Sequence, residues 1–164
     1  MIILLSIKNS NKYEETIKYS KFISLIFRVY NEEEVKKIIN NIKKEYPSAT
    51  HYCYAYIIEN NIKSSDDGEP SKTAGIPILN QIIGHNLNYT LIVVIRYFGG
   101  IKLGTGLLTR TYSKVAREVI QKDNIITLIK GYNITYNVLV TEETLNKLNN
   151  YKVIINNETY IEKE

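Results

Sequence analysis

The chain has 164 residues, of which 44% are hydrophobic, and a formal net charge of +4 at pH 7. This length suits one domain, or one domain with a small appendage, and the apolar content is enough to build a core. The longest apolar runs fall short of the roughly 18–20 residues of a membrane span, and the N-terminus lacks the features of a signal peptide. The single cysteine excludes a disulfide framework, which fits a reducing compartment, so we expect a cytoplasmic protein. Because the apolar runs are short, we expect no membrane partner.

The first part of the chain predicts three extended segments and then a helix. Residues 2–7 predict an edge strand and residues 13–20 a second extended piece. Residues 21–29 predict a half-buried strand, because apolar and polar side chains alternate there. Asn31 provides an N-cap, and an apolar stripe with helical spacing follows it until Pro47. We therefore expect a helix between these two residues.

Residues 51–58 predict the next strand, with Tyr52, Tyr54 and Tyr56 on one of its faces. Aromatic rings on an open sheet face can stack on nucleic-acid bases, so these tyrosines are candidate stacking residues. The alternative is an ordinary sheet surface in a protein rich in tyrosine. We favour that structural interpretation and keep the stacking hypothesis beside it.

Residues 64–73 form a loop by composition and contain the acidic residues Asp66, Asp67 and Glu69. Such carboxylates could bind a hard cation or act as acid and base. An Asp-Asp-Gly sequence is also an ordinary turn, in which Asp side chains accept nearby backbone N–H groups. We favour the turn, expect no metal and no other cofactor, and expect a helix from about Pro77 onward.

The stretch from 91 to 117 is the most informative part of the chain. Its apolar run at 91–95 predicts a strand buried on both faces, a glycine-rich turn follows, and helical spacing resumes at Leu108. The free N–H groups and positive dipole end of that helix offer a site for an anion, and basic residues surround the turn. The candidate nucleic-acid or anion-binding residues are Arg96, Gly99, Gly100, Lys102, Gly104, Thr105, Gly106, Arg110, Lys114 and Arg117.

The sequence gives little support for catalysis. The turn has neither the Walker spacing nor that of a dinucleotide-binding loop. His51 and Cys53 share one strand face, but no third residue nearby would orient them, and His85 stands alone. We therefore predict no catalytic residue.

The C-terminal part predicts a small β-α-β-β unit. Residues 124–130 extend toward it, and strands are expected at 132–140, 151–155 and 158–161, with a helix at 141–150. A unit of this size cannot hold a core alone, so it must pack on the body, pair with another chain or be a shortened domain.

Several segments closely resemble one known family. The block RYFGGIKLGTG from Arg96 onward, with segments 21–23, 49–55 and 66–77, is similar to the signature of the IMPACT (YigZ-like) family of translation-associated proteins. The resemblance covers roughly residues 13–120.

The resemblance implies an α+β fold. Its body, residues 1–130, would resemble the second domain of ribosomal protein S5 and domain IV of elongation factor G, with an antiparallel or mixed sheet and helices on one face. Residues 131–164 would form a partial ferredoxin-like segment, shortened relative to domain V of that factor. Two residues depart from the family pattern, which has glycine at the positions of Lys72 and Leu107.

The resemblance implies no established reaction. Eukaryotic relatives restrain an initiation-factor kinase by engaging its activator on ribosomes, and for bacterial members RNA or the ribosome is the implied partner. We therefore expect a non-enzymatic binding protein that regulates translation or a stress response through RNA, the ribosome or a translation-associated protein. Two alternatives are an enzyme acting on a phosphorylated or nucleotide substrate, with a metal in the acidic loop, and a protein–protein interaction module.

Overall fold

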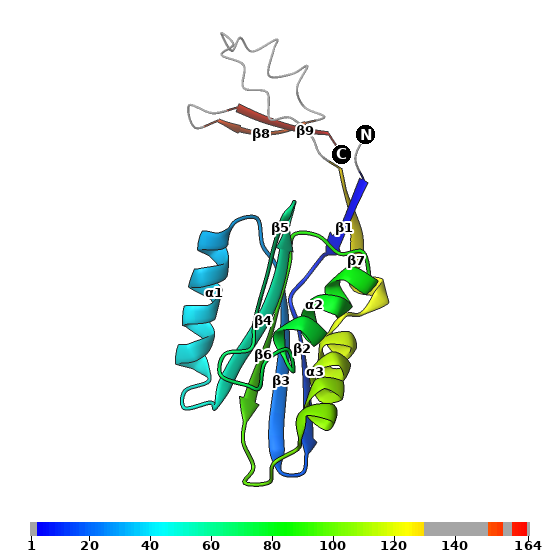
Figure 1. Ribbon diagram of the computed structural model, residues 1–164. Helices are drawn as coiled ribbons and strands as arrows, with labels where there is room; N and C mark the ends of the chain where they lie inside the picture. The colour runs from blue at the N-terminus through cyan, green and yellow to red at the C-terminus, as the bar shows by residue number, and fades with distance from the viewer. Residues whose placement is uncertain (1–2, 130–150, 156–158, 164) are drawn as a thin grey trace, which may run out of the picture. The chain divides into compact units, whose positions relative to one another are not determined.

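The computed structural model describes residues 3–129, 151–155 and 159–163 (Figure 1). The chain forms two compact units, Met1–Ile129 and Lys130–Glu164. No helix among the described residues is long and apolar enough to span a bilayer.

The first unit contains all the helices and most of the strands that the structure describes. Five strands form an antiparallel sheet in the order β2-β3-β6-β4-β5, and β1 pairs with β7 in a separate antiparallel ribbon. The elements are β1 (Ile3–Ile7), β2 (Asn11–Ile17), β3 (Ser20–Arg28), α1 (Glu32–Glu45), β4 (His51–Ile58), β5 (Asn61–Ser65), α2 (Gly75–Gly84), β6 (Thr90–Tyr97), α3 (Thr105–Val119), the 3-10 turn η1 (Lys122–Asn124) and β7 (Ile125–Ile129).

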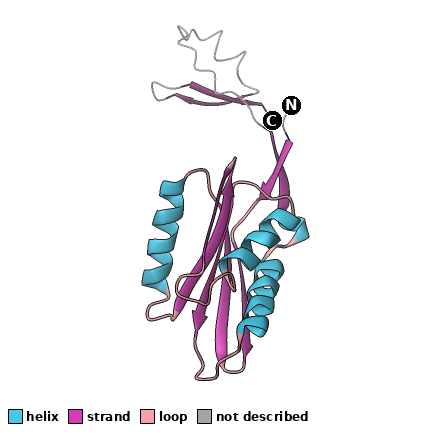
Figure 2. Cartoon of the chain, in the orientation of Figure 1, coloured by secondary structure: helices cyan, strands magenta, loops and turns pink. Residues whose placement is uncertain are grey.

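The sheet lies between two helical layers, with α1 on one face and α2 and α3 on the other (Figures 1 and 2). The predicted α+β class is confirmed, but the expectation of helices on one face only is wrong. The physical reason lies in β6, whose residues 91–95 are all fully buried. Because both faces of this central strand are apolar, each of them needs a covering layer.

The strand at 21–29 was predicted to be half-buried, and this prediction is also wrong. Phe22 and Ile26 of β3 belong to the core beneath α2 and α3, whereas Ile23 and Leu25 belong to the core beneath α1. The alternation in the sequence places Ile23, Leu25, Phe27 and Val29 on one side of the strand, but Phe22 and Ile26 on the other side are also apolar and fully buried. The strand therefore contributes to both cores.

The predicted helix after Asn31 is confirmed as α1. The Asn31 side chain accepts a hydrogen bond of 2.9 Å from the backbone N–H of Glu34, the interaction expected of an N-cap. Val35 and Ile42 of this helix are buried against the sheet. Strand β5 was not anticipated, because its short polar sequence at the sheet edge carries little apolar periodicity.

In the second unit, Lys130–Glu164, β8 (Tyr151–Ile155) pairs antiparallel with β9 (Thr159–Lys163). These two strands agree with the last two expected from the sequence. The strand and helix expected between residues 132 and 150 lie outside the described residues.

Candidate nucleic-acid interface

A cavity of about 430 Å³ lies where the acidic loop meets the glycine-rich turn and the start of α3. The ends of β4 and β6 contribute its remaining walls. Much of its lining is apolar, and its polar groups come from several separate segments. The residues that matter below are His51, Glu69, Arg96, Phe98, Lys102, Gly104 and Thr105.

Glu69 and Arg96 form a buried ion pair at this cavity. Arg96 Nη1 lies 2.6 Å from Glu69 Oε1, and the two side chains are only 6% and 3% exposed. The Tyr112 hydroxyl donates to the same carboxylate oxygen at 2.7 Å, and His51 Nε2 lies 3.6 Å from the other one. Arg96 is therefore engaged by the chain's own carboxylate and is not a surface cation.

The Arg96 guanidinium also lies close to two aromatic rings. Its central carbon is 5.5 Å from the ring centroids of both Phe22 and Phe98. Such cation–π contacts are strongest where water is excluded. The Nε atom of Arg96 is buried and has no hydrogen-bond partner among the described residues.

The acidic loop uses the carboxylate of Asp66 to hold its own backbone in place. Asp66 Oδ1 accepts hydrogen bonds from the backbone N–H groups of Ala74 (3.1 Å) and Gly75 (2.8 Å), and Oδ2 accepts from Lys72 (2.8 Å). Burial would raise the pKa of Asp66, but these hydrogen bonds outweigh it and hold the pKa below its ordinary value. Asp66 therefore connects the loop to the beginning of α2.

Asp67 and Glu69 are likewise committed to protein contacts. Asp67 Oδ2 accepts from the backbone N–H of Tyr52 at 2.7 Å, and Glu69 is held by Arg96 as described above. Within the described residues, no group of three or more His, Cys, Asp or Glu side chains is arranged to hold a metal ion.

Cys53 of β4 is fully buried and contacts the acidic loop. Its Sγ lies 3.0 Å from the carbonyl oxygen of Asp66 and 3.3 Å from the Tyr112 hydroxyl. Burial raises the pKa of the Cys53 thiol far above its ordinary value, and burial raises that of Tyr112 as well. Because the thiolate is the reactive form, this cysteine is a poor nucleophile at neutral pH.

The N-terminus of α3 lines the same cavity. Gly104 precedes the helix with a φ of +75°, a conformation that favours glycine, and no side chain caps the first N–H groups. Arg110 lies beside the first helical turn, since a Cβ on Gly106 would come 3.5 Å from Arg110 Nη1. Lys102 lines the cavity from the preceding turn. Arg110 and Lys102 are both exposed, and among the described residues neither has a carboxylate at salt-bridge distance.

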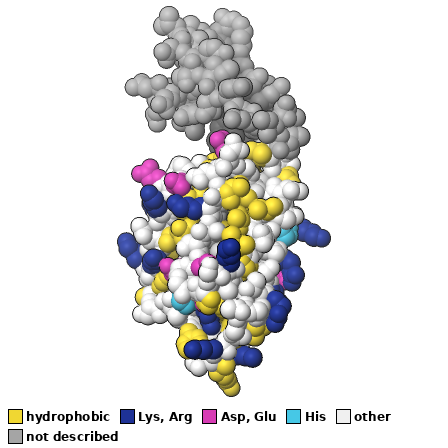
Figure 3. All heavy atoms as spheres, in the orientation of Figure 1, with side chains coloured by type: hydrophobic (Ala, Val, Ile, Leu, Met, Phe, Trp, Pro, Cys, Tyr) yellow, Lys and Arg dark blue, Asp and Glu magenta, His cyan; other side chains and the backbone are white. Residues whose placement is uncertain are grey.

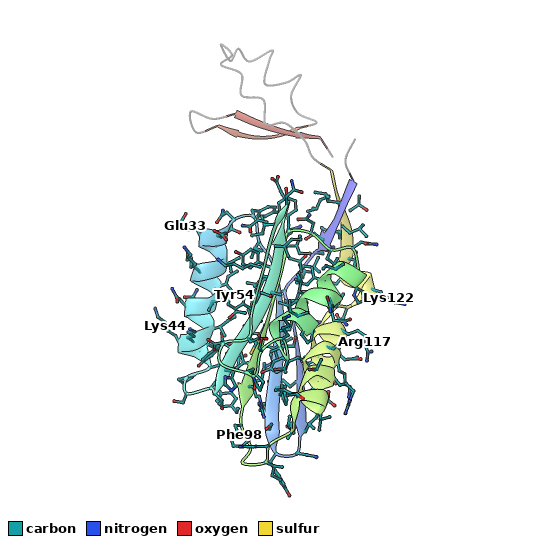
Figure 4. The ribbon with its side chains drawn as sticks, viewed as in Figure 1. Glu33, Lys44, Tyr54, Phe98, Arg117 and Lys122 are labelled. Atoms are coloured by element: carbon teal, nitrogen blue, oxygen red, sulfur yellow. The ribbon has the colours of Figure 1, made fainter. Side chains whose placement is uncertain are left out.

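The other two predicted cations of α3 have carboxylate partners. Lys114 Nζ lies 2.5 Å from Glu15 Oε1 of β2, and Arg117 Nη2 lies 3.1 Å from Glu118 Oε1. Both cations are exposed on α3, as is Arg110, which the helical spacing predicted. Figure 4 shows Arg117 on the outer side of this helix. The predicted basic stripe therefore has two neutralised members.

The structure does not support the stacking hypothesis for the three tyrosines of β4. Tyr56 is 2% exposed, and Tyr54 and Tyr52 pack against the core beneath α1. The rings of Tyr54 and Tyr56 stack on each other at 6.4 Å, and the Tyr52 hydroxyl donates to the carbonyl oxygen of Tyr46 at 2.6 Å. Helix α1 covers the face that would have to be open, which agrees with the favoured structural interpretation of these tyrosines and not with the stacking hypothesis.

The structure shows the conformation of Lys72 and the packing of Leu107, the two departures from the family pattern. Lys72 adopts a φ of +64°, a conformation that glycine reaches at no cost, which explains why a glycine would suit this position. Leu107 packs against the core cluster beneath α2 and α3. It therefore adds apolar contact where a glycine would leave space.

The model of the Impact N-terminal domain family matches residues 18–120. The chain belongs to the IMPACT family. It is 43% identical over 124 residues to the IMPACT family member YvyE of Bacillus subtilis (strain 168), which covers 74% of this chain and 57% of that protein. It is 35% identical over 113 residues to the IMPACT family member YigZ of Escherichia coli (strain K12), which covers 66% of this chain and 55% of that protein. The chain thus spans little more than half the length of these relatives.

A crystal structure of a hypothetical protein has the same fold as this IMPACT family chain. The TM-score is 0.74, with 29% sequence identity, over 94% of this chain and 80% of that chain.

Proposed function

We propose that this IMPACT family chain is a non-enzymatic binding protein that regulates translation or a stress response by binding structured RNA, with the ribosome as the setting. A translation-associated protein would be the second partner of the chain, bound in the same ribosomal setting. The observation that carries the proposal is the convergence of Lys102 and Arg110 on the uncapped N-terminus of α3.

This convergence suits a phosphodiester group. The first N–H groups of a helix point along its axis and carry a partial positive charge, so they bind anions well. Lys102 and Arg110 add two full charges, which the chain's described carboxylates do not neutralise. Phosphate contacts of this kind supply most of the sequence-independent affinity of RNA-binding proteins. The proposed contact set is therefore narrower than the predicted list, since Arg96, Lys114 and Arg117 are already paired.

An enzyme acting on a phosphorylated substrate remains a second candidate because of one specific observation. Glu69 and Gly104 line the same cavity, which is the proximity that this hypothesis requires. Against it, Glu69 is held by Arg96 and Tyr112, and Cys53 is protonated at neutral pH. The enzyme hypothesis is tested by incubating the chain with phosphate monoesters and nucleotides and measuring the phosphate that is released. Turnover that Glu69→Gln abolishes in a folded protein would support the enzyme.

Removing the two unpaired cations is expected to weaken RNA binding strongly. The variant Lys102→Ala/Arg110→Ala should lose at least about tenfold in affinity for ribosomal RNA, equivalent to about 1.4 kcal/mol. The matched control is Lys114→Ala/Arg117→Ala, which removes the same charge from cations that are already paired, and it should lose less than about threefold. Filter binding at one fixed salt concentration measures both. Equal losses in the two variants would show that net charge alone governs binding and would contradict the proposed site.

A further inference from the structure

The end of the sheet next to the cavity carries three large apolar side chains in contact with solvent. Tyr19, between β2 and β3, is 77% exposed, and Phe98 and Ile101, after β6, are 46% and 44% exposed. Figure 4 shows Phe98 at this end of the sheet, and Figure 3 shows hydrophobic side chains and basic side chains together there. We call the two loops, 18–19 and 98–101, the apolar tip.

The two loops of the apolar tip are locked against each other. A Cβ on Gly99 would lie 2.1 Å from the carbonyl carbon and oxygen of Tyr19, so only glycine allows this approach. The backbone N–H of Gly99 donates to Ser20 Oγ at 3.2 Å, and that of Phe98 donates to Thr50 Oγ1 at 2.9 Å. The Phe98 ring is also held by the guanidinium of Arg96 at 5.5 Å. The backbone that carries Tyr19 and Phe98 is therefore fixed by close packing and by hydrogen bonds.

The turn that carries Tyr19 has an unusual sequence for its conformation. Ile17 pairs with Ser20, which leaves Lys18 and Tyr19 as a two-residue turn, and their φ angles are +45° and +66°. Such turns favour Asn-Gly, because positive φ is unfavourable for other residues. A bulky aromatic side chain that is 77% exposed and kept in this unfavourable conformation favours a role other than stability.

The sequence segments that form the apolar tip carry only basic charged residues. Residues 17–21 and 96–104 contain Lys18, Lys21, Arg96 and Lys102 and no acidic residue. Lys21 pairs with Glu14, and Arg96 pairs with Glu69, which leaves Lys18 and Lys102 beside the exposed rings. Exposed aromatic rings flanked by cations match single-stranded RNA, in which bases stack on rings and phosphates lie near cations.

We infer that Tyr19 and Phe98 stack on unpaired bases of the bound RNA, while Lys18 and Lys102 contact the flanking phosphates. The inference rests on the proposed function and adds the kind of RNA that the chain selects, namely single-stranded loops or ends. A wholly helical RNA has no unstacked bases to offer, so the tip discriminates against it.

The test compares a single-stranded oligonucleotide with a duplex of equal length by fluorescence anisotropy at constant salt. Tyr19→Ala/Phe98→Ala should bind the single strand at least tenfold more weakly and the duplex within about twofold of the unmodified chain. The control variant Ile62→Ala/Ile83→Ala removes two exposed apolar side chains elsewhere, 53% and 49% exposed, and should bind like the unmodified chain.

Because Phe98 also contacts Arg96, the double variant could lose affinity through a folding defect. A second variant separates that effect from the loss of an RNA contact. Tyr19→Ala alone changes a side chain that is 77% exposed, and it should still lose at least about threefold in single-strand affinity. Unchanged affinity of both tip variants, with Lys102→Ala/Arg110→Ala still defective, would overturn this inference and leave the proposed function intact. A change confined to self-association in sedimentation velocity would identify the tip as a protein contact and also overturn it. Failure of the unmodified chain to bind any RNA would reject both proposals.

Discussion

Replacing Glu69 by alanine is expected to destabilise the folded chain by about 3–5 kcal/mol, the cost of leaving a buried charge without its partner. Arg96 would keep its charge at 6% side-chain exposure, because a guanidinium does not lose its proton in a protein. The Tyr112 hydroxyl would lose its acceptor as well. Urea denaturation followed by circular dichroism measures the change as a lower midpoint at an unchanged slope.

The matched control is Glu118→Ala, which removes the same side chain from an exposed pair. Glu118 and Arg117 have side chains 40% and 57% exposed, so this change should cost less than about 1 kcal/mol. Glu69→Gln keeps an acceptor for Tyr112 and should fall between the two. If Glu69→Ala unfolds at the same urea concentration as Glu118→Ala, the ion pair does not stabilise the cavity wall.

Replacing Asp66 by asparagine is expected to destabilise the chain by about 1.5–3 kcal/mol at pH 7, the range for hydrogen bonds to a charged group. The asparagine side chain has one acceptor oxygen, whereas the Asp66 carboxylate accepts from three backbone N–H groups with two oxygens. In this variant fewer hydrogen bonds would join the acidic loop to the start of α2.

The effect of Asp66 should depend on pH with a defined sign. Its pKa is lowered in the folded chain, so its carboxylate stabilises the fold fully above the unfolded value of about 3.9. That stabilisation is lost as the pH falls through the lower folded pKa. The difference in unfolding free energy between the unmodified chain and Asp66→Asn should therefore be constant from pH 7 to pH 5 and shrink below about pH 4. Asp123→Asn, at an exposed aspartate, is the control and should show almost no difference. A gap that stays the same at pH 3 would refute this role.

The local units of the fold could be read from the sequence. The apolar run at 91–95, the glycines after it and the helical spacing from Leu108 predicted β6, the turn and α3, because each depends on neighbouring residues. The cap at Asn31 and the end of α1 near Pro47 followed from the same local chemistry. These predictions needed no knowledge of the topology.

The partners of charged residues could not be read in this way. Arg96 meets Glu69 because β4 and β6 are neighbours, with His51 opposite Arg96, and the loop after β5 folds back over them. Lys114 meets Glu15, a residue 99 positions earlier in the chain, through the packing of α3 on β2. Periodicity shows that a cation is on an exposed face, but only strand order and helix packing show which carboxylates reach it.

The exposed aromatic residues of the apolar tip were missed for a related reason. Phe98 lay within the family signature and Tyr19 within an extended segment, so neither suggested an exposed site. The only local signal was Gly99, whose need for a close backbone approach became specific once Tyr19 was found against it.

The salt dependence of RNA affinity, measured for the unmodified chain and for Lys102→Ala/Arg110→Ala, tests the proposed phosphate contacts most directly. Each phosphate contact contributes about 0.7–0.9 to the slope of log affinity against log salt concentration, because binding releases counterions. We expect the double variant to have a slope smaller in magnitude by roughly 1.4–1.8, with Lys114→Ala/Arg117→Ala close to the unmodified chain. A slope in the Lys102/Arg110 variant equal to that of the unmodified chain would mean that the two cations at α3 do not contact phosphate.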